Sequence, residues 1–440
     1  MHWELPLRPE GRPSVVERRQ LGGLLDETGY GAAAGLPTNV RASTILHVLS
    51  LGFTVDLWRP ISEATDDTRT RLDEYSRYLA SYDVVALGRR RISPSRLELG
   101  RNFTAHAACG RSWVGAFASA LRIANGILRR KKIDLIQAQD PVLTGVAASI
   151  LGSRYRIPVN VCVYGANPWD AGWLSERPRR LLQARIARSV LHRAAGIQVD
   201  GKTTEASLLQ HGIAADRIAR KPMIPSIIDR LFELRSDSAL RGVLTENGRW
   251  PTVALFVGRL ARQKNLSFLL DVLSDLKKRG LAVRLVIVGS GSIESELRSR
   301  ARDLDVGDRV LWLGEQPHAN IGPLMAGSDV IVLPSIYEGF ARVLVEAAAA
   351  GRPIVCSSVS GADEAVVHGT TGFVCPIGDR SAFVAAITRL VQCPDLANEM
   401  GRRARIFIRG EIEPLRDLSL QVRIWERIVQ RTDRAGDLGA

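Results

Sequence analysis

Residues 329–351 read DVIVLPSIYEGFARVLVEAAAAG, which is the pattern of a strand, a loop and a helix in succession. Residues 329–333 are a short apolar run that ends at a proline, as expected of a strand buried on both faces. After a polar loop, apolar residues recur at helical spacing until Gly351 and Pro353 end the helix. Such a strand, loop and helix form one unit of a parallel α/β sheet.

The same alternation of apolar runs and helical patterns recurs from Thr38 onward. We expect an initial helix at residues 40–51, and residues 226–250 are polar enough to form a linker. The strands expected before this linker are residues 53–58, 83–87, 133–137, 159–163 and 196–199. The strands expected after it are residues 253–257, 283–288, 310–313, 330–333, 354–356 and 372–375.

The chain has 440 residues, which exceeds the roughly 250–300 residues at which a single hydrophobic core stops growing. We therefore expect two Rossmann-like, doubly wound α/β lobes that face each other across a cleft, over residues 1–230 and 231–412. The last helical pattern, in residues 413–440, is expected to cross back to the first lobe. In open α/β sheets, ligands bind at the carboxyl ends of the strands.

Two carboxylates flank the start of the helix in the opening stretch. Glu338 lies in the loop and Glu346 lies eight residues later in the helix. Main-chain N–H groups at a helix N-terminus suit a diphosphate, and Gly339 allows a ligand to approach closely. A carboxylate one or two turns into the helix can accept both hydroxyl groups of a ribose. The alternative is that both acids are solvated residues beside a helix.

A second pattern, FVGRLARQKN, occupies residues 256–265. A strand ends in Gly258, and two cations, Arg259 and Lys264, precede a helix. The arginine can bind two oxygens at once and the lysine supplies a point charge, so together they can neutralise a diphosphate. The alternative is an exposed basic loop without a ligand.

The two patterns together resemble the retaining glycosyltransferases of family 4, which have the GT-B fold. Glu338 and Glu346 match the E-x7-E element of that family, and residues 258–265 match its G-R-x4-K-N element. The resemblance implies that the second lobe binds a nucleotide-sugar and that the first lobe takes the acceptor. It also implies catalytic roles for Arg259, Lys264 and Glu338. The donor-binding residues that it implies are Gly35, Gly258, Gly289, Gly339, Phe340, Ala341 and Glu346.

Several of these assignments depend on weaker signals. Gly289 lies in a glycine-rich turn at residues 288–292, and Gly35 lies in another at residues 29–40; a plain turn is the alternative for both. Residues 312–316 lie where members of the family usually place the nucleotide base. The first lobe has glutamines and a tyrosine where the family often has histidines, which leaves Asp140 and Tyr164 as candidate contacts to the sugar or acceptor.

The resemblance implies transfer with retention at the anomeric carbon, through an oxocarbenium-like transition state. It implies neither a metal nor a cofactor, because the two cations can neutralise the leaving diphosphate. We expect a glycan or lipid-linked acceptor in cell-surface polysaccharide or glycoconjugate synthesis. The alternatives are a nucleotide-sugar epimerase on the same fold and a non-catalytic protein that binds polyanions.

The formal net charge of +14 is concentrated in the first half of the chain. Residues 1–230 contain 33 basic and 21 acidic residues, whereas the remainder contains 27 and 25. This asymmetry suggests a polyanionic partner, which is a membrane surface, a phosphorylated lipid or a nucleic acid, with a solvated arginine-rich surface as the alternative. The clusters are Arg89 to Arg91, Arg129 to Lys132, and Arg177 with Arg179 and Arg180.

One basic cluster follows an apolar pattern, because Trp113, Phe117, Leu121 and Leu128 recur at helical spacing before it. This helix would rest on a bilayer or, as the alternative, face the core. No nucleic-acid motif is present, and none of the five cysteines is spaced for a metal site. Since no apolar run is long enough to span a membrane, we expect a cytoplasmic protein, peripheral at the inner face of the cell membrane.

Overall fold

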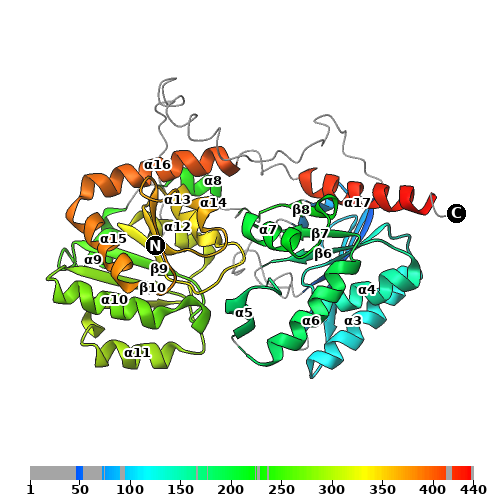
Figure 1. Cartoon of the computed structure of the whole chain (residues 1–440), viewed down its shortest axis with the longest axis horizontal. Coiled ribbons are helices and arrows are strands. Elements are labelled where there is room, and N and C mark those ends of the chain that lie inside the picture. Colours follow the sequence, from blue (N-terminus) through cyan, green and yellow to red (C-terminus); the bar gives the residue numbers. More distant parts are fainter. Residues whose placement is uncertain are drawn as a thin grey trace, which may run out of the picture. The chain divides into compact units, whose positions relative to one another are not determined.

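A computed structural model describes residues 46–52, 72–73, 75–89, 95–164, 167–175, 177–222, 224, 228–234, 237–412 and 419–437. Two sheets with helices packed on them form two α/β lobes, which confirms the predicted fold class (Figure 1). Gly35 and the strand predicted at residues 53–58 lie outside the described residues. No described helix is long and apolar enough to cross a bilayer.

The first sheet has the strand order β3-β4-β2-β1-β5-β6-β7-β8. All of its neighbouring strands are parallel except β3 and β4. The direction in which the chain winds reverses between β1 and β5, which is where an open sheet binds ligands. The strands are β1 (His47–Gly52), β2 (Ser81–Gly88), β3 (Arg96–Glu98), β4 (Phe103–Cys109), β5 (Leu135–Ala138), β6 (Val159–Val163), β7 (Gly196–Val199) and β8 (Ile218–Arg220).

Two predictions in this lobe are wrong or incomplete. The helix expected at residues 40–51 is replaced by strand β1 over its described part. This strand is buried on both faces, and a short apolar run in the core has no periodicity that separates strand from helix. Strands β3, β4 and β8 were not predicted, because β4 is rich in alanine and the other two are only three residues long.

Helices cover both faces of the first sheet. One core contains residues of α3, α4 and α6, whereas residues of α17 pack in a separate core against the other face. Helix α3 buries Ala116, Ala120 and Ala124, while Trp113 at its start is exposed. The helices of this lobe include α3 (Trp113–Leu128), α4 (Leu143–Tyr155), α5 (Ala171–Ser175), α6 (Arg179–Arg193), α7 (Lys202–Gln210) and α17 (Ser419–Asp437).

The last helix, α17, completes the core of the first lobe. Trp425 is fully buried, packs against the rings of Tyr75 and Tyr82, and donates a hydrogen bond from Nε1 to Gln137 Oε1. Two further hydrogen bonds join the amides of Gln421 and Gln198, at 2.8 and 3.0 Å. The contacts therefore join residues about 220 to 350 positions apart in the sequence.

The second sheet has the order β11-β10-β9-β12-β13-β14 and is entirely parallel, with its winding reversed between β9 and β12. Every strand predicted here is present, because each is a β-branched or leucine-rich run that ends at a turn residue. The strands are β9 (Thr252–Val257), β10 (Val283–Val288), β11 (Val310–Gly314), β12 (Val330–Leu333), β13 (Ile354–Ser357) and β14 (Gly372–Cys375).

The helices of the second lobe include two within the expected linker. Residues of α8 join the core of this lobe, so part of residues 226–250 packs rather than merely connects. The helices are α8 (Ile228–Glu233), α9 (Ser238–Thr245), α10 (Leu266–Lys278), α11 (Glu294–Asp303), α12 (His318–Ala326), α13 (Arg342–Ala349), α14 (Ala362–Ala365), α15 (Arg380–Gln392) and α16 (Pro394–Ile412).

Candidate active site

The two sequence motifs of the second lobe leave adjacent strands at the point where the winding reverses. Arg259 and Lys264 follow β9, and Glu338 follows β12. Strands β9 and β12 are parallel neighbours, so both motifs begin at the same edge of the sheet. This is the position at which doubly wound sheets bind their ligands.

Hydrogen bonds join the two loops. Lys264 Nζ lies 2.5 Å from Glu338 Oε1, and Gln263 Nε2 donates to the carbonyl oxygen of Tyr337 at 2.9 Å. Ser335 Oγ donates to the same Glu338 oxygen at 2.6 Å. The side chains of Lys264 and Glu338 are only 15% and 9% exposed, so the ion pair is shielded from water. The structure thus places the ammonium group of Lys264 against Glu338, the residue that precedes Gly339.

Arg259 differs from Lys264 in being exposed. In the part of the chain that the structure describes, no carboxylate pairs with the Arg259 guanidinium. Its hydrogen-bond donors are therefore available to an anion that enters from solvent, five residues from the shielded lysine.

The entrance to helix α13 offers main-chain donors. Ala341 occupies the N-cap position and its side chain makes no capping hydrogen bond. The N–H groups of Gly339, Phe340 and Ala341 donate to no acceptor among the described residues. Unpaired N–H groups at a helix N-terminus, together with the helix dipole, form a site suited to a phosphate.

Glu346 lies in the second turn of α13 and is buried. Its Oε1 is 3.4 Å from Nε2 of His318, the first residue of α12. Sequence reasoning did not identify His318, although it follows the segment at residues 312–316 by only two positions. A histidine beside a buried carboxylate fixes the orientation of that carboxylate.

Glycines bring three strand ends together beside this site. The N–H of Gly258 donates to the carbonyl of Val288 at 3.0 Å, and the N–H of Gly289 donates to that of Gly314 at 2.8 Å. Gly289 has a φ of +134°, and a Cβ there would lie 2.0 Å from the carbonyl oxygen of Gly258. Packing between the turns therefore explains this glycine without a ligand.

The two candidates in the first lobe are engaged in internal hydrogen bonds. Asp140 caps helix α4: its Oδ1 accepts from the N–H groups of Val142 and Leu143 at 2.7 Å, and its Oδ2 accepts from the N–H and hydroxyl of Thr144. The hydroxyl of Tyr164 accepts from Gln198 Nε2 at 2.7 Å, and burial raises the pKa of Tyr164. Their roles toward a sugar stay predictions.

A carboxylate from the second lobe caps a helix of the first. Helix α7 has Gly201 at its N-cap and therefore no capping side chain of its own. Glu364 in α14 accepts a hydrogen bond from the main-chain N–H of Lys202 at 2.7 Å, and burial raises the pKa of Glu364. A Cβ at Gly201 would lie 2.9 Å from Glu364 Oε1, so the glycine permits this approach.

The described residues contain no group of three or more histidine, cysteine, aspartate or glutamate side chains arranged to hold a metal. The arrangement at β9 and β12 instead combines two cations, open N–H groups and a buried carboxylate. It can bind a diphosphate and, one helical turn away, a polyhydroxyl group.

Comparisons with protein families agree with this geometry. The family described as "Glycosyl transferases group 1" matches residues 246–407, and the family described as "Glycosyl transferase 4-like domain" matches residues 69–223.

Curated relatives match over part of their length. Glycogen synthase of Mycobacterium tuberculosis is 32% identical over 41% of this chain and 47% of the relative. Alpha-D-kanosaminyltransferase of Streptomyces kanamyceticus is 28% identical over 53% and 62%, and the 2-deoxystreptamine glucosyltransferase of that organism is 25% identical over 71% and 82%. The chain thus spans about half the length of the first two relatives.

Solved structures share the fold. Sucrose-phosphate synthase from Thermosynechococcus elongatus superposes with a TM-score of 0.70 at 18% identity, over 89% of this chain and 98% of that chain. Anabaena HepE in complex with UDP and glucose superposes with a TM-score of 0.66 at 20% identity, over 88% and 99%.

Proposed function

Because the chain belongs to the GT-B glycosyltransferases, we propose that it transfers a sugar from a nucleotide-sugar donor to an acceptor hydroxyl group. The observation that carries this proposal is the junction of the β9 and β12 loops. There Lys264 pairs with Glu338, the residue that precedes the open N–H groups at the start of α13. Such a site requires a donor that carries a diphosphate. The structure of Anabaena HepE was solved in complex with UDP and glucose.

In the proposed reaction, Arg259 and Lys264 neutralise the charge that grows on the departing diphosphate. The N–H groups of Gly339 and Phe340 would donate to its oxygens from the helix entrance. Preorganised donors in a shielded site stabilise such a charge far better than water does. Lys264 is held in place by Glu338, so little reorganisation is needed when the charge appears.

Glu346 would hold the nucleotide by accepting hydrogen bonds from the two ribose hydroxyl groups. His318 contacts Oε1 of this carboxylate and so positions it. Among the described residues, no histidine contacts Oε2. Glu346 lies four residues after Arg342, the first residue of α13, which is about 6 Å along the axis at about 1.5 Å per residue.

We propose that transfer retains the configuration at the anomeric carbon through an oxocarbenium-like transition state. The acceptor proton would pass to the leaving phosphate oxygen as the new glycosidic bond forms and the sugar–phosphate bond breaks. The two cations take the neutralising role that a metal has elsewhere. Glu338, beside Lys264, would face the donor sugar.

The proposed acceptor is a glycan or a lipid-linked sugar in the synthesis of a cell-surface polysaccharide or glycoconjugate. The surplus of basic residues in the first lobe supports an anionic partner on that side. The relatives named above are transferases and synthases, which favours transfer over the epimerase alternative.

A panel of UDP-, GDP- and ADP-sugars tests the proposal in two steps. One donor should raise the melting temperature of the protein by ligand binding. With that donor and a sugar acceptor, NMR of the product should show the anomeric configuration of the donor. Inversion would refute retention, and conversion of the donor alone into an epimer would refute transfer. No shift and no product with any donor would refute the proposed function itself.

A further inference from the structure

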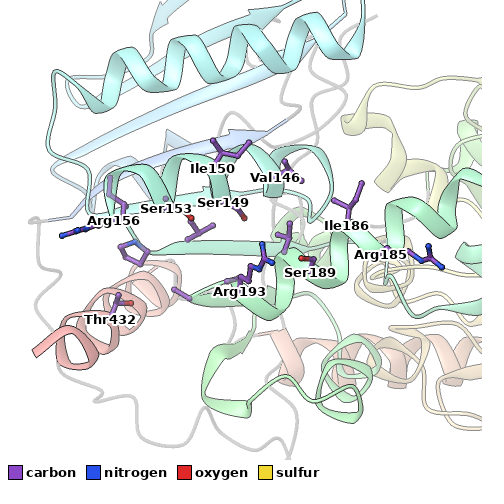
Figure 2. A pocket seen from close by; sticks show the side chains of 17 residues that line it. Val146, Ser149, Ile150, Ser153, Arg156, Arg185, Ile186, Ser189, Arg193 and Thr432 are labelled. Carbon is purple, nitrogen blue, oxygen red and sulfur yellow. The ribbon is translucent and has the colours of Figure 1, made fainter. Parts of the chain in front are cut away.

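Helices α4 and α6 of the first lobe enclose a hollow of about 920 Å³. Figure 2 shows the side chains of both helices around it, with Thr432 of α17 at one end. Its wall is mainly apolar and includes Val146, Ile150, Pro158 and Ile186. We call the solvent-facing sides of these two helices, with the hollow between them, the α4–α6 surface.

The hollow lies at the amino ends of two strands of the first sheet, whereas the candidate active site lies at the carboxyl ends of strands of the second sheet. Its floor includes Pro158, which precedes β6, Val159, which begins it, and Ala195, which precedes β7. The candidate contact Tyr164 follows the other end of β6. The five residues of β6 span roughly 15 Å at about 3.3 Å per residue. The hollow is therefore a separate feature.

The α4–α6 surface is basic without acidic counterparts. Neither helix contains an aspartate or glutamate. Arg156, Arg185 and Arg193 line the hollow and are exposed, and none of them pairs with a carboxylate in the described parts of the chain. By contrast, Lys131 and Lys132 at the end of α3 pair with Asp83 and Asp134 at 2.8 and 3.1 Å. The charge of the α3 cluster is thus partly neutralised within the protein.

Exposed apolar side chains accompany these arginines. Leu181 and Leu182 at the start of α6 are 60% and 63% exposed, and Ile150 projects from α4. Leu181, Leu182, Arg185, Ser189 and Arg193 are spaced so that they share one face of α6. Two adjacent leucines beside unpaired arginines are costly in water but favourable where head groups meet acyl chains.

We propose that the α4–α6 surface docks on a lipid bilayer that contains anionic phospholipid. The arginines bind lipid phosphates, Leu181 and Leu182 enter the acyl boundary, and the hollow receives apolar parts of a lipid. A nucleic acid would satisfy the arginines but would gain nothing from the leucines. The inference does not depend on the transfer reaction, because the surface is formed by helices of the first lobe and the proposed donor site by loops of the second.

Vesicle flotation of the full chain tests the proposal at low and high salt. The probes are vesicles of phosphatidylcholine alone and of phosphatidylcholine mixed with phosphatidylglycerol. Wild type should float with the mixed vesicles at low salt and not with the neutral ones. Arg185→Glu/Arg193→Glu should lower the partition coefficient by about 30-fold or more, since each arginine near an anionic surface contributes about 1 kcal/mol. Leu181→Ser/Leu182→Ser should lower it by about tenfold.

Matched controls distinguish this surface from charge in general. Arg279→Glu/Arg302→Glu makes the same charge change at exposed positions of the second lobe and should leave flotation close to wild type. Arg129→Glu/Arg130→Glu tests the α3 cluster and should have a smaller effect than the α6 pair. An effect as large as that of the α6 pair from either control would overturn the proposal.

Two further outcomes would also overturn it. One is failure of wild type to float with anionic vesicles. The other is unchanged flotation of the leucine variant combined with tighter binding of a single-stranded oligonucleotide, which would indicate a general polyanion surface. Donor binding in vesicle-free buffer should be the same in wild type and in every surface variant. Loss of donor binding by all of these proteins would instead count against the proposed function.

Discussion

The two lobes end their strands in different ways. After β9 and β12 of the second lobe, the Arg259 guanidinium and the N–H groups at Gly339 have no described protein partner. After β5 and β6 of the first lobe, Asp140 caps its own helix and Tyr164 bonds to Gln198. Polar groups at the carboxyl ends of strands are available to a ligand only where the fold has not already used them.

This contrast is tested most strongly at Lys264. Lys264→Ala should lower kcat/KM for transfer by about 10²- to 10³-fold, because it removes a preorganised charge from the diphosphate site. Steady-state kinetics with the identified donor measures the loss. The far-ultraviolet circular dichroism and the melting temperature should show that the variant is folded.

Two companions of this variant separate charge from packing. Lys264→Arg keeps a cation and should recover part of kcat/KM. Glu338→Gln keeps the acceptor for Ser335 but removes the partner charge of Lys264. Wild-type kinetics in Lys264→Ala would mean that the second lobe does not hold the leaving group.

The next effect is expected at Glu346. Glu346→Ala should weaken binding of the matching nucleoside diphosphate by about 30-fold, which corresponds to about 2 kcal/mol for lost hydrogen bonds to a charged group. Isothermal titration calorimetry measures it directly. Asp271→Ala, which removes an acid on α10 paired with Arg300, is the control and should bind normally. Equal affinities in both variants would remove the ribose assignment.

Asp140 tests the other side of the contrast. Asp140→Ala should lower the free energy of unfolding by about 1–2 kcal/mol, as expected for loss of an N-cap, with kcat/KM little changed in the folded protein. Urea denaturation and kinetics measure the two quantities. Asp140→Asn can still cap the helix and should be closer to wild type. A large loss of kcat/KM without a loss of stability would make Asp140 a substrate contact.

The smallest effect concerns the pH dependence of stability at Glu364. Burial raises the pKa of Glu364 above its usual value of 4.5, so the folded protein holds this proton more tightly than the unfolded chain does. Its contribution to stability is therefore present at low pH and is lost as pH rises through the raised pKa. Glu364→Gln cannot ionise and should lack this slope. Urea denaturation across that pH range checks it, and parallel curves for the two proteins would contradict it.

The second lobe was predictable from sequence because its signals are local. Each strand is a short apolar run ended by a turn residue, and the motif residues Lys264 and Glu338 follow two of them. The structure places these two side chains in contact. Two supporting contacts come from other segments: Gln263 donates to the carbonyl of Tyr337, and His318 lies beside Glu346, so no local pattern reveals them.

The first lobe was less predictable because its cues are ambiguous. Strand β1 is buried on both faces, and its apolar residues fit a helix equally well. In α3 the core-facing alternative holds for most of the apolar pattern, because Phe117, Leu121 and Leu128 pack against the core and Trp113 is exposed. The pattern missed Ala116 and Ala120, which are fully buried. Asp140 has the residue type of a ligand contact, and only its bonds to α4 reveal the capping role.

The position of α17 has a consequence for biosynthesis. Trp425 fills the core of the first lobe, although more than 180 residues of the second lobe lie between it and the preceding first-lobe strand β8. A chain emerging from the ribosome must therefore present the second lobe before the first can close its core. Until then, the apolar face around Tyr75 and Tyr82 lacks its cover, and a nascent chain halted before α17 would expose it to chaperones.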